Sequence, residues 1–147
     1  MNITCLSPSN PVELDCLAAL AHQLWPHHSP EELGTEFCSF LSCGGAVFAA
    51  WEEEQMVGFA QRSLRHDYVE GCSHSPVGYL EGIFVLPQYR HRGISRQLLS
   101  SCESWAKQQG CLEFASDCEL TNADSLHFHL ACGFQEANRI ICFQKEL

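Results

Sequence analysis

The segment between residues 77 and 96 constrains the fold more than any other part of this chain. Residues 77–86 form an apolar run that predicts a strand, and Pro87 ends it. The short turn Arg90-His91-Arg92-Gly93 then leads directly into a helix, which the apolar spacing predicts over 93–109. A helix N-terminus carries unpaired N–H groups and a partial positive charge, and Gly93 lets the backbone approach an anion closely. The turn is therefore a candidate phosphate site, although a tight turn with exposed arginines fits the same pattern.

The charge of the chain supports the phosphate interpretation. Arg90, Arg92 and Arg96 place three of the eight Lys and Arg residues in this one segment, whereas 18 Asp and Glu residues give the chain a net charge of −10. So acidic a protein argues against nucleic acid as a partner. A negative cleft would favour a cationic partner if the acids converge on a pocket, but solubility alone is the plainer explanation of the charge.

The remaining residues predict alternating strands and helices. Asn10-Pro11 gives an N-cap followed by proline at the first helical position, and Gly110 fits the end of the third helix. We expect strands over 2–6, 46–51, 56–65, 77–86 and 112–116, helices over 11–23, 30–41, 93–109 and between Asn122 and Gly133, and one or two closing strands in 134–146. The order predicts one α+β domain, residues 1–147, with a mixed sheet. The first helix should bury Val12, Cys16, Leu20 and Leu24.

Ten cysteines are a high count, but none form a C-x-x-C pair, so we expect no metal site. We expect reduced thiols packed as small hydrophobes, Cys16, Cys102 and Cys142 among them, rather than a disulfide framework.

The N-terminus lacks the basic start and apolar run of a signal peptide, and no window approaches the roughly 20 apolar residues of a membrane span. We therefore expect a soluble cytoplasmic protein with no membrane partner.

Two motifs resemble a known superfamily. Arg90-x-x-Gly93-x-Ser95 resembles the Q/R-x-x-G-x-G/A pyrophosphate loop of the GNAT acyl-CoA N-acyltransferases, with Ser95 at the last small position. Residues 122–134, which end in Gly-Phe, resemble the fourth helix of that family. This resemblance implies the GNAT fold: a mostly antiparallel mixed sheet with a splayed parallel strand pair, flanked by about four helices.

Further stretches narrow the resemblance. Residues 23–26, 65–69, 80–87 and 115–117 resemble the short, single-domain aminoglycoside 6′-N-acetyltransferases. The combined match runs from about residue 20 to the C-terminus. It implies acetyl-CoA as co-substrate, a polycationic aminoglycoside as acceptor, and a homodimer.

The resemblance also implies which residues bind the co-substrate. The splay should free backbone N–H groups at Ile83-Phe84-Val85, and we expect the Val85 N–H to bind the thioester carbonyl oxygen, although these residues are core strand as well. The expected contacts are Ile83, Phe84, Val85, Arg90, His91, Arg92, Gly93, Ile94, Ser95, Arg96 and Asn122. For Asn122, an N-cap role alone would explain the residue.

Two carboxylates are candidates for the acceptor amine. Asp117 follows the apolar strand 112–116 and can project into the splay. Glu81 lies within an apolar strand, where a carboxylate is costly unless it is paired or faces water, so an outward position is its alternative. The resemblance implies that both hold and orient an ammonium group.

Aromatic and polar residues complete the expected site. Trp25 and Tyr68 suit the wall of a sugar-binding pocket, because aromatic faces stack on sugars and attract ammonium groups, although Trp25 also fits a core position. Glu136 and Asn138, with Asp67 and Glu70, could line the rim. His129 occupies the position where GNAT enzymes often carry a tyrosine that protonates the leaving thiolate; it is either that acid or a packed helix residue.

The sequence thus predicts direct acetyl transfer to the 6′-amine of an aminoglycoside, with catalytic residues Asp117, Glu81, Val85 and His129. The same fold acting on a polyamine or a protein lysine is one alternative, and an acetyl-CoA-binding module without turnover is another.

Overall fold

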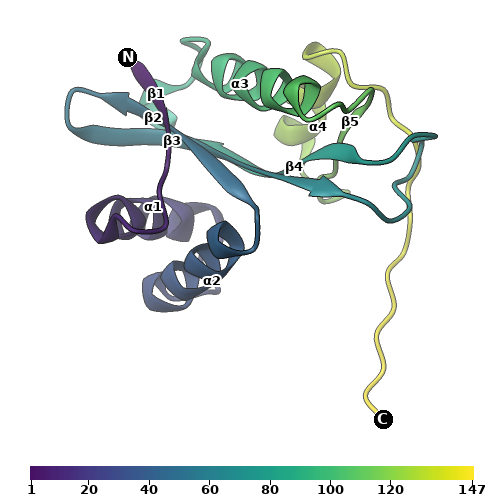
Figure 1. Cartoon of the computed structure of the whole chain (residues 1–147), viewed down its shortest axis with the longest axis horizontal. Coiled ribbons are helices and arrows are strands. Elements are labelled where there is room, and N and C mark those ends of the chain that lie inside the picture. The colour runs from purple at the N-terminus through teal and green to yellow at the C-terminus, as the bar shows by residue number, and fades with distance from the viewer.

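The computed structural model describes all residues from 1 to 147 and has a five-stranded sheet between two layers of helices (Figure 1). The elements in chain order are β1 Asn2–Cys5, α1 Pro11–Leu24, α2 Pro30–Ser42, β2 Ala46–Glu52, β3 Gln55–Arg65, β4 Val77–Val85, a 3₁₀ turn η1 Pro87–Tyr89, α3 Ile94–Gln108, β5 Phe114–Ser116 and α4 Ala123–Ala131. The sheet order is β1-β2-β3-β4-β5, and only the β4–β5 pair is parallel. The predicted α+β class, with its mixed sheet and four helices, is confirmed.

Local signals set most of the helix boundaries. The side chains of Asn10, Ser29 and Asn122 accept backbone N–H groups at 3.2, 3.1 and 3.1 Å and cap α1, α2 and α4. Gly110 has φ +85°, as an αL position after a helix requires.

The core lies on both faces of the sheet. α1 and α2 cover one face, α3 and α4 the other (Figure 1). Leu98 and Cys102 of α3 are fully buried, as the predicted apolar stripe requires. The stripe predicted for α1 is correct in part: Leu20 is buried, and Cys16 and Leu24 pack against the core. It is wrong at Val12, which is 70% exposed, and it missed Leu17 and Ala21, which are fully buried. The small alanines of α1 let the helix approach its neighbours closely. The face that is buried is therefore rotated about the helix axis from the face that was predicted from the larger residues.

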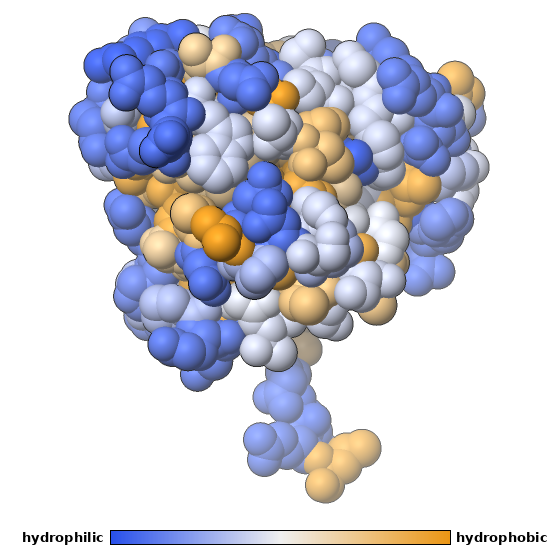
Figure 2. Space-filling model, turned by 60° about the vertical axis from the view of Figure 1, so that its left-hand side comes forward, coloured by the Kyte–Doolittle hydropathy of each residue, from blue (hydrophilic) through white to orange (hydrophobic).

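The C-terminal segment differs from the prediction. Residues 134–147 contain no strand; the segment first runs past β5, and its C-terminal end then projects away from the body (Figures 1 and 2). Ile140, Ile141 and Phe143 are 64, 80 and 90% exposed. The predicted closing strands are absent because a strand needs a partner edge, and this segment pairs with no strand of its own chain.

All ten cysteines are free thiols, but only some are packed. Cys102 and Cys111 are buried, whereas Cys142 lies exposed in the C-terminal segment, contrary to the prediction.

No helix is both long and apolar enough to cross a bilayer. No group of three or more His, Cys, Asp or Glu side chains is arranged to hold a metal ion.

Candidate active site

The sheet opens between β4 and β5 where the two candidate carboxylates lie. β5 pairs with β4 over three residues only, and the last pair is Leu80 with Ser116. β4 continues to Val85 with no strand on that edge. We call this opening the splay.

A β-bulge determines which backbone groups of β4 face the splay. On the β3 side, Gly82 pairs with Gln61 and Leu80 pairs with the next residue, so Glu81 is the extra residue of the bulge. Beyond it, Leu86 donates its N–H to Val57 O of β3 at 2.9 Å. Because N–H groups alternate between the two edges of a strand, the Val85 N–H points into the splay. Val85 therefore has a backbone N–H donor that faces the splay and is not bonded to β3.

The turn after β4 presents the N-terminus of α3. His91 and Gly93 both adopt left-handed backbone conformations, with φ +61° and +79°. α3 has no side-chain cap, so the N–H groups of its first turn lack intrahelical partners. A Cβ on Gly93 would meet nothing within 4 Å, so glycine is needed here for its φ angle, and the space beside it is open to an anion.

Three arginines surround this turn, and each donates to a backbone carbonyl. Arg90 Nε bonds Val85 O at 2.9 Å, Arg92 Nη2 bonds Gln88 O at 3.1 Å, and Arg96 Nη2 bonds Ala131 O at 3.0 Å. None of them forms an ion pair with a carboxylate, so their positive charges remain available to a phosphate group.

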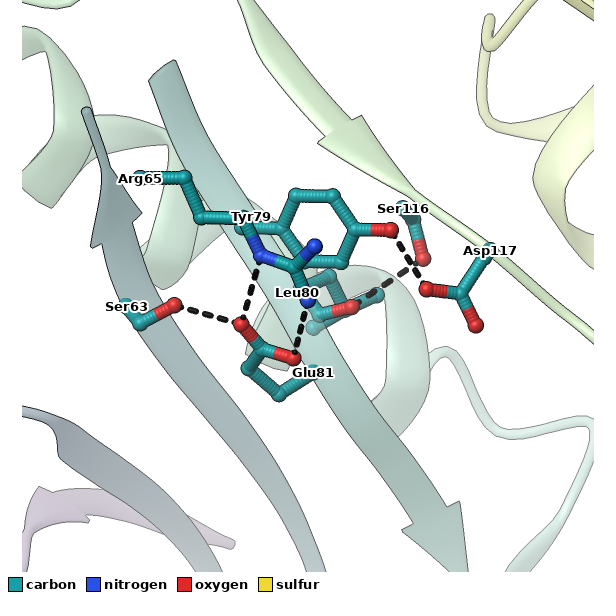
Figure 3. Close-up of polar contacts among 7 residues, drawn as sticks. All are labelled: Ser63, Arg65, Tyr79, Leu80, Glu81, Ser116 and Asp117. Carbon is teal, nitrogen blue, oxygen red and sulfur yellow. Dashed lines mark hydrogen bonds and ion pairs between the residues drawn. The ribbon is translucent and has the colours of Figure 1, made fainter. Parts of the chain in front are cut away.

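Glu81 is held by a dense set of donors (Figure 3). Ser63 Oγ donates to Oε1 at 2.6 Å, while Arg65 donates through Nε to Oε1 at 3.1 Å and through Nη2 to Oε2 at 2.8 Å. The hydrogen bond from Arg65 to Glu81 raises the pKa of Arg65. A carboxylate offers about four acceptor sites, so roughly one remains free on Glu81. Glu81 is therefore ion-paired and partly exposed, with its side chain 24% accessible, and its role toward an acceptor stays a prediction.

Asp117 differs from Glu81 in having no cationic partner. It follows β5 directly and is exposed. Its Oδ2 accepts a hydrogen bond from the Tyr79 hydroxyl, and its other acceptor sites are free (Figure 3). Asp117 is thus the carboxylate of this pair that is available to an ammonium group.

Both ring nitrogens of His129 are engaged. Nδ1 lies 2.7 Å from the carbonyl oxygen of Ser125, which can only accept, so Nδ1 carries a proton. Nε2 lies 2.8 Å from Ser116 Oγ, and this hydroxyl lies 3.2 Å from Leu80 O at the closed end of the splay. The ring also packs edge-on against Phe134 at 5.0 Å. Ser116 Oγ therefore links Nε2 of His129 to the closed end of the splay.

Trp25 lies beside the bulge and belongs to the core as well. Its ring packs on Phe37 and Phe59 at centroid distances of 6.4 and 6.1 Å. A Cβ on Gly82 would lie 2.9 Å from Trp25, so glycine is required for this close approach. Trp25 also lines a cavity of about 200 Å³ with Glu36 and Gln61. Trp25 is therefore in part a core residue, and its role as the wall of a substrate pocket stays a prediction.

The rim residues form a separate cluster. Tyr68 is 79% exposed, and its hydroxyl lies 3.5 Å from Glu70 Oε2, the oxygen that also accepts from Asn138 Nδ2 at 3.2 Å. Glu136 pairs with Arg139, whose hydrogen bond lowers the pKa of this carboxyl. No hydrogen bond joins this cluster to Glu81 or Asp117. Asn122 uses its amide oxygen as the cap of α4.

A separate cavity of about 800 Å³ lies between α1, the β2–β3 turn and η1, with Glu52, Glu53, Glu54, Tyr89 and Arg92 among its lining residues. It contains none of the acceptor residues.

The sequence reasoning missed three residues of the site. Arg65 neutralises Glu81, Tyr79 bonds Asp117, and Ser116 links His129 to the splay. The period-two pattern of strands puts Arg65 with Ser63, and Tyr79 with Glu81, on one face, and this signal could have found two of the three. Ser116 is brought to His129 only by the packing of α4.

The comparison with known families assigns the class. A profile of the acetyltransferase (GNAT) family matches residues 14–134. The match covers most of the chain, so this protein belongs to the GNAT family of acetyltransferases.

Particular relatives within that family are similar over nearly the full length. An aminoglycoside N(6′)-acetyltransferase type 1 from Salmonella typhimurium is 42% identical over 137 residues, which are 92% of this chain and 94% of the relative. Among solved structures, aminoglycoside N-acetyltransferase AAC(6′)-Iy in complex with CoA has a TM-score of 0.92 at 39% identity and covers 99% of this chain and 95% of its own. The same enzyme in complex with the bisubstrate analogue CoA-S-monomethyl-acetylneamine has a TM-score of 0.89 at 38% identity, with both chains fully covered.

Proposed function

We propose that this protein transfers the acetyl group of acetyl-CoA to the 6′-amine of aminoglycoside antibiotics and so gives resistance to them. One observation carries the proposal: Asp117, a carboxylate without a cationic partner, lies beside the closed end of a splay that leads along β4 to an uncapped helix N-terminus. The first group suits an ammonium ion and the second a pyrophosphate. Relatives at 38–42% identity that are named for this acetyl transfer support the same function.

Acetyl-CoA binds along β4 in this proposal. The first turn of α3, with the turn 90–93 before it, holds the pyrophosphate through backbone N–H groups and arginine charge. The pantetheine arm pairs with the free edge of 83–85, as an added strand would. This leaves the thioester in the splay, with its carbonyl oxygen at the Val85 N–H.

The acceptor enters from the side of Glu81 and Asp117. The carboxylates attract and orient its ammonium groups, and the reacting group loses a proton to water or to Asp117. The neutral amine attacks the thioester carbon directly in a ternary complex, so no acetyl-enzyme forms. The Val85 N–H stabilises the oxyanion, and the nitrogen of the tetrahedral intermediate gives a second proton to water. The intermediate then collapses to the amide and CoA thiolate.

The thiolate takes its proton from water or from His129 through the Ser116 hydroxyl. The hydrogen bonds of His129 favour the second route only when Nε2 carries a proton, because Nδ1 is committed to the Ser125 carbonyl. His129→Gln therefore separates the two routes: an unchanged kcat supports water as the donor.

The test is release of free thiol from acetyl-CoA with a panel of amines: kanamycin, tobramycin, gentamicin, spermidine and a lysine peptide. We expect fast turnover on the aminoglycosides, acetylation at the 6′ position by NMR, and a steep loss in Asp117→Ala. Preferred use of spermidine or the peptide would select another amine acceptor. Binding of acetyl-CoA with no turnover on any amine would select a non-catalytic module.

We also propose that the protein works as a homodimer in the cytoplasm. Residues 134–147 expose the apolar side chains of Ile140, Ile141 and Phe143, and β5 leaves one edge of the sheet unpaired. Pairing of such elements between two copies would bury both. Ten free thiols and a need for acetyl-CoA suit the cytoplasm.

Light scattering tests the dimer. Ile141→Asp should yield a monomer, whereas Val12→Asp, at an apolar residue of α1 that is 70% exposed against 80% for Ile141, should leave the assembly intact. A monomeric wild-type protein at micromolar concentration would exclude the dimer.

A further inference from the structure

The Tyr79 hydroxyl is the one group of this protein that holds the Asp117 side chain. Tyr79 is 6% exposed on β4 and packs with Val69 and Val77. Asp117 lies one residue beyond β5, where the chain has left regular structure, and its carboxylate has no other hydrogen bond or ion pair. The direction of an exposed carboxylate is therefore set by a buried phenol on a rigid strand.

The phenol itself is held from two sides. The Arg65 guanidinium lies 3.4 Å from the centroid of the Tyr79 ring, and Glu81 fixes that guanidinium with two hydrogen bonds (Figure 3). Burial and the neighbouring Asp117 raise the pKa of Tyr79, so its oxygen keeps its proton and donates it. Ser63, Glu81, Arg65, Tyr79 and Asp117 thus form one continuous chain of contacts.

This contact leaves Asp117 able to bind an ammonium group. The hydroxyl occupies one of about four acceptor sites of the carboxylate. A carboxylate held in one orientation loses less freedom when it binds the acceptor, and it presents the amine from one direction. The hydroxyl therefore affects where the amine sits as well as how Asp117 is held.

We propose that Tyr79 is a positioning residue of the acetyl transfer: its hydroxyl holds Asp117 beside the splay, so that the bound amine is aimed at the thioester carbon. The proposal rests on the proposed function, because it takes Asp117 as the acceptor carboxylate. If the hydrogen bond from Tyr79 to Asp117 only fixed the segment after β5, it would stabilise the fold without affecting the chemical step.

Tyr79→Phe tests the proposal, since it removes one oxygen and keeps the ring beneath Arg65. We expect kcat with kanamycin to fall about tenfold while the KM for acetyl-CoA stays within twofold. Tyr89→Phe is the matched control, because its hydroxyl bonds Gln55 at 3.2 Å away from the splay. Circular dichroism and the thermal midpoint verify that both variants fold.

A double-mutant cycle with Asp117→Asn gives the readout that a structural tie would not move. If Tyr79 acts through Asp117, Tyr79→Phe has no further effect on kcat in the Asp117→Asn background. Effects that multiply overturn the proposal, as does an unchanged kcat in Tyr79→Phe or a change in acceptor KM alone. The cycle is run with whichever amine the wild type acetylates fastest, so failure on aminoglycosides remains distinct from failure of the positioning role.

Discussion

Removal of Arg65 should strengthen acceptor binding. In the free protein Arg65 fills both oxygens of Glu81, so a substrate ammonium must compete with it. For two charges about 4 Å apart, Coulomb's law gives roughly 1 to 4 kcal/mol between the dielectric constants of water and a protein surface. The side chains of Arg65 and Glu81 are 42 and 24% exposed, which selects about 1 kcal/mol from that range. Arg65→Gln should therefore lower the KM for tobramycin about fivefold, since 1.4 kcal/mol corresponds to a factor of ten.

The assay is thiol release at saturating acetyl-CoA with tobramycin varied. Glu81→Gln supplies the comparison: in its background adding Arg65→Gln removes only the repulsion between Arg65 and the acceptor, so KM should fall by less than it does when Glu81 is present. A KM that is unchanged or higher in Arg65→Gln alone would refute the reasoning, because it would mean that the acceptor never reaches Glu81. kcat is read alongside, since Arg65 also lies on the Tyr79 ring.

Three further predictions concern the fold and the co-substrate. Leu98→Ala should lower the free energy of unfolding by about 2–5 kcal/mol in urea titration, because Leu98 is fully buried between α3 and the sheet. Arg90→Ala should raise the KM for acetyl-CoA about tenfold and leave the acceptor KM alone, as loss of one charge-assisted contact requires. The hydrogen bond from His74 and the Ser73 N–H lower the pKa of Glu113, so its stabilising effect is present above pH 4.5 and is lost as the pH falls through the lowered value. Thermal midpoints of Glu113→Gln and wild type should differ near pH 6 and converge in acid.

Features that depend on neighbours in sequence could be predicted well. The caps Asn10 and Asn122 and the left-handed Gly110 follow from local backbone chemistry, and all three are found. The prediction of a buried apolar stripe on α3 is likewise correct, because the large apolar residues of this helix define a single face to bury. α1 carries small residues on several faces, so tertiary packing, which the sequence does not display, chose the face with Leu17 and Ala21.

The C-terminal segment marks the opposite limit. Residues 134–146 have the apolar content of strands, and the prediction of strands there rested on that content. Strand propensity describes how a residue fits a sheet that already exists, and no edge of this chain pairs with the segment. The sequence of a single chain can therefore show that a segment is suited to strand pairing, but it does not show which strand edge the segment pairs with.

The candidate site was predicted in its residues more than in its geometry. Glu81 attracted attention as a carboxylate in an apolar strand, and the structure explains how it is tolerated: it is the extra residue of a bulge, bound by Arg65 and Ser63. A bulge comes from the pairing of β4 with β3 and leaves no mark in β4 alone. The same bulge shifts the alternation of N–H groups, so that one irregularity both admits the carboxylate and turns Val85 toward the splay.

The distribution of the acids explains more about the acceptor than their sum does. The net charge of −10 attracts any cation from a distance, but salt screens it beyond about 10 Å. At short range three acids already have charged or ionisable partners: Glu81 has Arg65, Glu136 has Arg139, and Glu113 has His74. Asp117, beside the splay, has only a neutral phenol. A carboxylate that is oriented but not neutralised gains most from a new ammonium, so under the proposed function we expect Asp117, rather than the total charge, to determine where the amine binds.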